Sequence, residues 1–151
     1  MKLRKIVSGG QTGADRAGLD HAIDRGIPHG GWCPRGRRAE DGAIDPRYEL
    51  RETPSADPAV RTEWNVRDSD GTAIFCIHYP LTGGTLLTER FARQYGKPCL
   101  ILCKTLPDGD RSAKLRKFIG EHRIEILNIA GPRASSEPDL DRFVREILDR
   151  L

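Results

Sequence analysis

Short apolar runs alternate along the chain with segments whose apolar residues recur at helical spacing. The runs at 3–7, 72–77, 98–103 and 124–129 predict short buried strands, and those at 72–77 and 98–103 lack the polar alternation of a half-exposed sheet. Strands that alternate with amphipathic helices are typical of an α/β domain with a mainly parallel sheet. Right-handed crossovers then place helices on both faces, so we expect three layers, α/β/α.

Helix boundaries are marked by local signals. Gly26 is expected to end the first helix, and Asp57 followed by proline is expected to begin the next. Either Asp108 or Asp110 can cap the helix after the third run, and Ser136 is expected to cap the last one.

Composition restricts the class of protein. The chain has 151 residues, which predicts one domain over residues 1–151, and 25 basic against 22 acidic side chains give a net charge of only +3. This balance does not favour nucleic acid as a partner. No apolar run approaches the length of a membrane span or forms a signal peptide, so we expect a cytoplasmic protein without a membrane partner.

The four cysteines do not predict a metal site. They form no Cys-x-x-Cys pair, and the four histidines do not group with them. Three of them lie in apolar runs, where small buried thiols are the simpler interpretation: Cys76, Cys99 and Cys103.

A glycine-rich turn joins the first apolar run to the first helical segment. It reads SGGQTGAD over residues 8–15. Glycines let the backbone approach a ligand, and the helix start that follows offers unpaired N–H groups and a positive potential. This combination favours an anion such as phosphate, although a plain strand-to-helix turn has a similar composition. The residues predicted to bind are Gly9, Gly10, Gln11, Thr12, Gly13 and Asp15.

A second glycine-rich turn, LTGGT at 81–85, follows the second apolar run. Ligands of parallel sheets bind outside the carboxyl ends of the strands, so we expect the two turns to share one edge and one site. Threonine hydroxyls in both turns add donors suited to an oxyanion. The residues of this turn predicted to bind are Thr82, Gly83, Gly84 and Thr85.

The segment 34–55 has little predicted structure and is rich in arginine. Loops of this length in compact domains are usually functional or disordered. Arg35 and Arg37 carry guanidinium groups that can pair with phosphate, and we expect both to contact the ligand. Arg38 can instead be neutralised by Glu40 or Asp41.

Other polar residues have two interpretations. Asp15 can bond an N–H or hydroxyl of a pterin or sugar, or simply complement the helix start. Glu89 lies about one turn into the helix that follows the second glycine-rich turn, and it can face a ligand if a reaction needs a carboxylate. Asp68 and Asp70 precede a strand, at the end remote from the predicted site, and are interpreted as structural.

The best-known phosphate loops do not match. The first turn has no Gly-x-Gly-x-x-Gly, and Ala14 and Asp15 follow Gly13 where a P-loop has lysine. No arrangement of nucleophile and base can be located from the spacing. We therefore expect a protein that binds its ligand without a recognisable catalytic set.

Four stretches resemble the signature blocks of the molybdenum cofactor carrier protein family. They are SGGQTGADRA at 8–17, GWCPRGRRAEDG at 31–42, RTEWNVRDSDGT at 61–72 and LTGGT at 81–85. The resemblance implies a Rossmann-like fold, an oligomer that is commonly a tetramer, and binding of the molybdenum cofactor. This cofactor, molybdopterin with its metal, is an anionic pterin that bears a phosphate. A carrier of this kind stores the cofactor and delivers it to molybdoenzymes as recipient partners.

The same family resembles the lysine-decarboxylase-like, cytokinin-activating phosphoribohydrolases. Those enzymes carry Pro-Gly-Gly-x-Gly-Thr-x-x-Glu, whereas Glu89 of this chain falls one position later. The alternative function is therefore a nucleotide-derivative binding protein or a nucleoside 5′-monophosphate phosphoribohydrolase. Only that hydrolase would give Glu89 a catalytic role, and the shifted position argues against it.

Overall fold

The computed structural model describes residues 3–151, and its main sheet is parallel throughout. Its strands are β1 (Lys5–Val7), β2 (His29–Gly30), β7 (Gly71–Cys76), β8 (Cys99–Cys103) and β9 (Ile126–Ala130). They lie in the order β2-β1-β9-β7-β8, so the last strand of the chain occupies the middle of the sheet. The register pairs Lys5 with Ile126 and Gly71 with Leu127.

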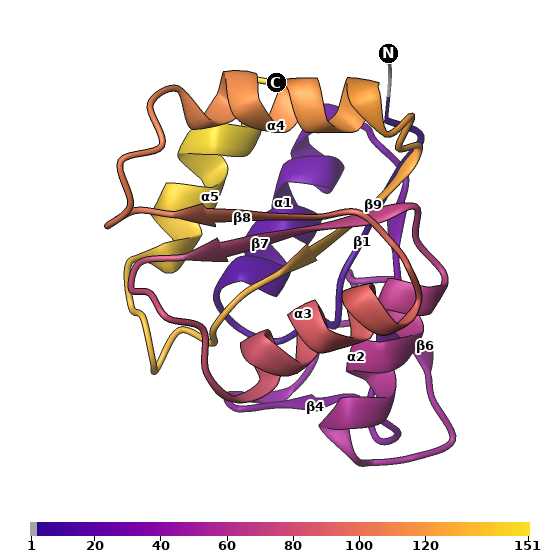
Figure 1. Cartoon of the computed structure of the whole chain (residues 1–151). Coiled ribbons are helices and arrows are strands. Elements are labelled where there is room, and N and C mark those ends of the chain that lie inside the picture. The colour runs from indigo at the N-terminus through magenta and orange to yellow at the C-terminus, as the bar shows by residue number, and fades with distance from the viewer. Residues whose placement is uncertain (1–2) are drawn as a thin grey trace.

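Helices cover both faces of the sheet (Figure 1). They are α1 (Ala14–Arg25), α2 (Pro58–Arg67), α3 (Gly83–Gln94), α4 (Arg111–Glu121) and α5 (Leu140–Leu148). Helices α1, α4 and α5 pack together on one face, and α2 and α3 pack on the other (Figure 1). The expected Rossmann-like three-layer arrangement is therefore confirmed.

The two faces of β7 show how the core is divided. All six of its residues are buried, as predicted for a strand covered on both sides. Successive side chains of a strand point to opposite faces. Ala73 and Phe75 accordingly join the apolar cluster of α1, α4 and α5, and Ile74 and Cys76 join the cluster beneath α3.

The segment after β2 contains only short elements. They are β3 (Trp32–Cys33), β4 (Arg38–Ala39), β5 (Gly42–Ala43) and β6 (Arg51–Glu52). β4 and β5 form an antiparallel hairpin, and β6 pairs with β3. The prediction that 34–55 holds no long regular element is confirmed. Within residues 3–151, none of the helices combines the length and the apolar character needed to cross a membrane.

Most predicted helix boundaries are confirmed. Gly26 closes α1 in the left-handed conformation, and the Asp57 carboxylate accepts a hydrogen bond from Ala59 N at the start of α2. Of the two candidate caps for α4, Asp110 is the one that bonds the helix, through Ala113 N. Asp108 instead pairs with Lys114.

The prediction that Ser136 caps the last helix is wrong. Helix α5 begins at Leu140, with Asp139 at the N-cap position. Ser136 N and Glu137 N both donate to Arg133 O, so the chain makes a turn where a helix was expected. Pro138 follows directly, and a proline disfavours helical geometry in the residue before it.

Asp110→Ala should lower the free energy of unfolding by about 1 kcal/mol, because it removes the acceptor that satisfies the Ala113 N–H. Asp139→Ala is the matched control, since the Asp139 side chain makes no capping bond to α5. Urea denaturation of both variants measures the difference. Equal losses would contradict the assigned cap.

Candidate functional site

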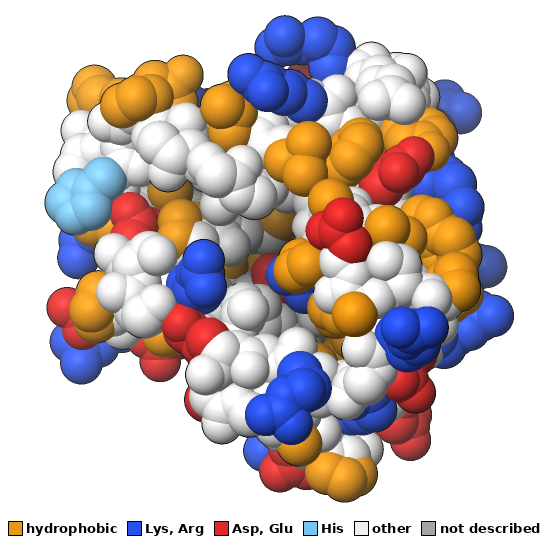
Figure 2. Space-filling view, turned by 90° about the horizontal axis from the view of Figure 1, so that it is seen from below, with side chains coloured by type: hydrophobic (Ala, Val, Ile, Leu, Met, Phe, Trp, Pro, Cys, Tyr) orange, Lys and Arg blue, Asp and Glu red, His pale blue; other side chains and the backbone are white. Residues whose placement is uncertain are grey.

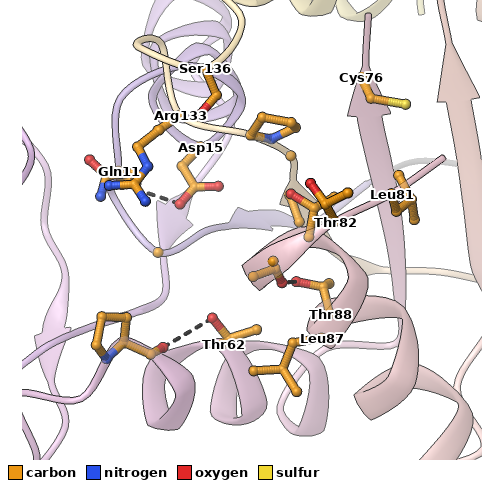
Figure 3. A pocket seen from close by; sticks show the side chains of 18 of the residues that line it. Gln11, Asp15, Thr62, Cys76, Leu81, Thr82, Leu87, Thr88, Arg133 and Ser136 are labelled. Carbon is orange, nitrogen blue, oxygen red and sulfur yellow. Dashed lines mark hydrogen bonds between the residues drawn. The ribbon is translucent and has the colours of Figure 1, made fainter. Parts of the chain in front are cut away.

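A cavity of 680 Å³ lies at the carboxyl ends of β1, β9 and β7. Its walls come from the β1–α1 loop, one face of α2, the β7–α3 loop with the start of α3, and the β9–α5 loop. Figure 3 shows Gln11, Asp15 and Arg133 on one side and Thr82 on the other. From below, the surface is hollowed, with charged side chains of both signs around the hollow (Figure 2).

The cavity lies where the strand order of the sheet reverses. The chain leaves β1 to form β2 on one side, and leaves β7 to form β8 on the other. Loops that depart in opposite directions open a crevice between them, which is where parallel sheets bind their ligands. The strand between them, β9, contributes Asn128 and Ala130 to the floor.

Two helices begin at this crevice without a side-chain cap. The N-cap residues of α1 and α3 are Gly13 and Thr82, and neither side chain bonds its helix. Helices α2 and α4, in contrast, are capped by aspartates. Uncapped N–H groups combined with the positive end of a helix dipole favour a bound anion.

The two uncapped helix starts differ in charge. Helix α1 carries Asp15 in its first turn, and Asp15 Oδ2 accepts a hydrogen bond from Gln11 N at 3.2 Å. Helix α3 has no acidic residue in its first turn, and Thr82, Gly83 and Gly84 are exposed. The start of α1 is therefore complemented by its own carboxylate, whereas the start of α3 is open to an external anion.

Asp15 is a buried carboxyl group in the wall of the cavity. Its side chain is 8% exposed, and burial raises its pKa from 3.8 to about 6. The nearby Arg61 guanidinium and the bond from Gln11 N lower the pKa but only partly offset burial. Buried carboxyls with raised pKa values concentrate at functional sites.

Arg61 connects α2 to the β1–α1 loop. Its Nη1 donates to Gly9 O at 3.0 Å, and its charge acts on Asp15. Two further residues of α2, Thr62 and Asn65, also line the cavity. A helix far along the chain from the first turn thus supplies part of the same wall.

Hydrogen bonds outside the cavity join the β4–β5 hairpin to the wall that the β1–α1 and β9–α5 loops form. The Glu40 carboxylate accepts hydrogen bonds from Ser135 Oγ, Ser135 N and Thr12 Oγ1. Gln11 Oε1 accepts from Glu40 N at 2.9 Å. Arg16 donates to both oxygens of Asp41, at 2.5 and 2.8 Å. We call the bonds around Glu40, which join Gln11, Thr12 and Ser135, the Glu40 clasp.

The match to known proteins covers nearly the whole chain. A family model described as "Circularly permutated YpsA SLOG family" matches residues 6–151. The chain belongs to this family. A crystal structure of a "putative molybdenum carrier protein" from Syntrophus aciditrophicus SB is 48% identical and superimposes with a TM-score of 0.94. The similarity covers 97% of this chain and 93% of that one, which confirms the predicted resemblance. No curated protein matches the chain significantly.

In this member of the YpsA SLOG family, the cavity brings together seven of the residues predicted from the two turns. They are Gly9, Gln11, Asp15, Thr82, Gly83, Gly84 and Thr85. Gly10, Thr12 and Gly13 belong to the same β1–α1 loop but are not among the lining residues within 3–151. The Thr12 side chain is engaged in the Glu40 clasp.

The predicted arginines lie outside the cavity lining in the described chain. The Arg37 guanidinium donates to four carbonyl groups of its own loop. Arg35 N donates to Ser55 O, and the Arg35 side chain is exposed. Contact of Arg35 and Arg37 with a ligand stays a prediction.

Thr88, and not Glu89, lines the cavity on α3. Thr88 holds the position at which the phosphoribohydrolase motif compared above has glutamate, and its hydroxyl donates to Gly84 O. Burial, and then the charge of Glu89, raises the pKa of the Cys99 thiol to about 12, which places Glu89 near β8. A turn of about 100° per residue separates the two side chains.

The sequence alone did not identify the β9–α5 loop as part of the site. Arg133 and Ser136 line the cavity, and the buried Glu137 carboxylate accepts from Ile77 N and His78 N at 2.8 and 2.9 Å. The available signal was an arginine and a serine shortly after Gly131-Pro132.

Asp68 and Asp70 are structural, as expected. Asp68 accepts a hydrogen bond from Trp32 Nε1, and Asp70 accepts hydrogen bonds from Glu125 N and Ile126 N.

Gly13→Ala should destabilise the protein by about 2 kcal/mol or more, because a Cβ there would lie 2.5 Å from Pro132 O at a φ of +83°. Gly26→Ala is the control: its φ is also positive, at +66°, but no atom lies within 4 Å. The control should lose only the cost of left-handed backbone, about 1 kcal/mol. Urea unfolding distinguishes the two, and equal losses would contradict a tight contact between the loops.

Asp15→Asn should change the pH dependence of stability. Because the folded pKa of about 6 exceeds the ordinary 3.8, the wild type holds this proton more tightly when folded. The stabilisation is complete below about pH 4 and is lost as the pH rises through about 6, a total near 3 kcal/mol. Urea unfolding of both proteins across this range should show the wild type falling relative to the variant. A constant difference would refute the raised pKa.

Proposed function

We propose that the cavity binds a small phosphate-bearing ligand, the molybdenum cofactor or a similar pterin or nucleotide, and that the protein carries this ligand without transforming it. The observation that supports this proposal most is the uncapped start of α3. It opens into a cavity whose other wall presents Arg133.

A phosphate at the start of α3 would meet three kinds of donor. The first N–H groups of α3 have no side-chain cap, and the hydroxyls of Thr82 and Thr85 line the cavity beside them. Arg133 is exposed at the rim, where its guanidinium can pair with phosphate oxygens. The cavity volume of 680 Å³ lies in the range typical of small-molecule sites.

The organic part of the cofactor, and not its metal, would be held by the protein. Among residues 3–151, no three His, Cys, Asp or Glu side chains group as metal ligands. Cys76 lines the cavity, but burial raises the pKa of its thiol, which therefore stays protonated at neutral pH. The carried metal would remain on the sulfur atoms of its own pterin.

Carriage is favoured over hydrolysis by the position of one carboxylate. The phosphoribohydrolase motif has a glutamate where this chain has Thr88, and Glu89 lies near Cys99 of β8. A nucleoside 5′-monophosphate shares the phosphate and planar ring of the cofactor, and it is therefore the second ligand to test.

Protein purified from a cofactor-replete host should contain pterin and molybdenum in comparable amounts. Fluorescence of the oxidised pterin and elemental analysis measure them. The apoprotein should regain both when the cofactor is supplied. Absence of both, with no uptake on addition and no binding of nucleoside monophosphates, would overturn the proposal.

Arg133→Ala should weaken binding of the phosphate-bearing ligand about fivefold, on the order of 1 kcal/mol for an exposed ion pair. The loss should shrink at high salt, because salt screens the pair. Arg142→Ala removes the same charge from the exposed surface of α5, away from the cavity lining, and should leave affinity unchanged. Titration calorimetry measures both, and equal effects would indicate only a general charge effect.

A further inference from the structure

Tyr79 is a large side chain left unusually open to water. It is 53% exposed, and in residues 3–151 the other exposed large apolar side chain is Leu151. Tyr79 lies in the loop between β7 and α3 and lines the cavity. An exposed ring at the mouth of a cavity is more informative than an exposed ring elsewhere, because apolar surface there is available to a ligand.

The other two tyrosines are used differently. Tyr48 OH donates to Asp20 and Tyr95 OH donates to Glu63, both at 2.6 Å. No such bond to Tyr79 occurs within the described residues, so no hydrogen bond of the fold fixes its hydroxyl, and the residue stays 53% exposed.

The chain directly before Tyr79 is held firmly. The Glu137 carboxylate, 7% exposed, accepts hydrogen bonds from Ile77 N and His78 N. The ring is therefore presented from an anchored position at the end of β7. Ordering the loop in advance reduces the entropy that a ligand must offset on binding.

Tyr79 and the open helix start belong to one short loop. Three residues lie between Tyr79 and Gly83, the first residue of α3, which limits their Cα separation to about 14 Å. A ligand with a ring at one end and a phosphate at the other can contact both. Aromatic residues hold planar rings by stacking, which tolerates different ring chemistries.

We propose that Tyr79 is the stacking platform for the planar ring of the ligand, whose phosphate is bound at the start of α3. This inference rests on the proposed function and names the residue that recognises the heteroaromatic ring of the phosphorylated ligand. Phosphorylated sugars that lack a ring of this kind would bind only through the phosphate. Tyr79 then determines specificity, and the helix start supplies a contact common to all these ligands.

The test compares two probes on the full-length protein by titration calorimetry. Guanosine 5′-monophosphate carries the amino-pyrimidinone ring that a pterin also has, and ribose 5-phosphate lacks the base. Tyr79→Ala should weaken guanosine 5′-monophosphate binding at least fivefold, near the lower end of what stacking contributes for one base, roughly 1 kcal/mol. Its affinity for ribose 5-phosphate should be unchanged.

Two control variants accompany it. Tyr79→Phe keeps the ring and should bind guanosine 5′-monophosphate within about twofold of the wild type. Leu151→Ala removes the other exposed apolar side chain and should have no effect. In proton NMR, the base proton of the nucleotide should move upfield on binding to the wild type, as expected over an aromatic ring, and should not do so with Tyr79→Ala.

The outcomes separate this inference from the proposed function. If the wild type binds neither probe, the anion site fails and the inference fails with it. If Tyr79→Ala binds guanosine 5′-monophosphate as well as the wild type does, the inference is overturned and the anion site stands. If Tyr79→Ala instead changes only the oligomeric state in light scattering, Tyr79 is a contact between copies of the chain, which also overturns it.

Discussion

The parallel pairing of β9 between β1 and β7 is the constraint on which the cavity depends. Because β9 pairs with β1 on one side and with β7 on the other, it separates these two strands and aligns the carboxyl ends of all three. The loops that follow can then face one another. Because β9 comes last along the chain and pairs Ile126 with Lys5, the two halves of the sheet join only through a contact between distant segments.

A division of electrostatic roles follows from this geometry. Helices α1 and α3 begin at the same crevice, and both direct the positive end of a dipole into it. Asp15 neutralises the first at the cost of its own desolvation, which is why its pKa rises. Helix α3 has no acidic residue in its first turn, so the attraction of its dipole for an anionic group of a ligand is not offset there.

The features predictable from the sequence were those with local signals. The glycine turns, the Asp57 cap and the unbroken apolar run of β7 follow from neighbouring residues alone, whereas the sequence left Asp108 and Asp110 as alternative caps of α4. Strand order does not follow from neighbouring residues, so the sequence could not place Arg133 and Ser136 beside the first turn. The prediction of a cap at Ser136 failed for the same reason. The turn there places Glu137 where its carboxylate bonds Ile77 N and His78 N, which lie after a different strand. Whether Thr88 or Glu89 faces the cavity depends on the rotational phase of α3. A motif that is shifted by one residue does not determine that phase.

Different contacts hold the two sides of the cavity in place, and the Glu40 clasp holds one of them. It joins the loops after the first and last strands to an external hairpin, so this wall is ordered when the protein folds and not when the ligand arrives. The facing loop begins at an anchored point but leads into exposed Gly83 and Gly84, where the structure leaves open space. The first wall is thus fixed by its bonds to the hairpin, and the second by the Glu137 bonds that precede Tyr79. Substitutions in the hairpin would therefore alter ligand affinity through rigidity, without any contact to the ligand.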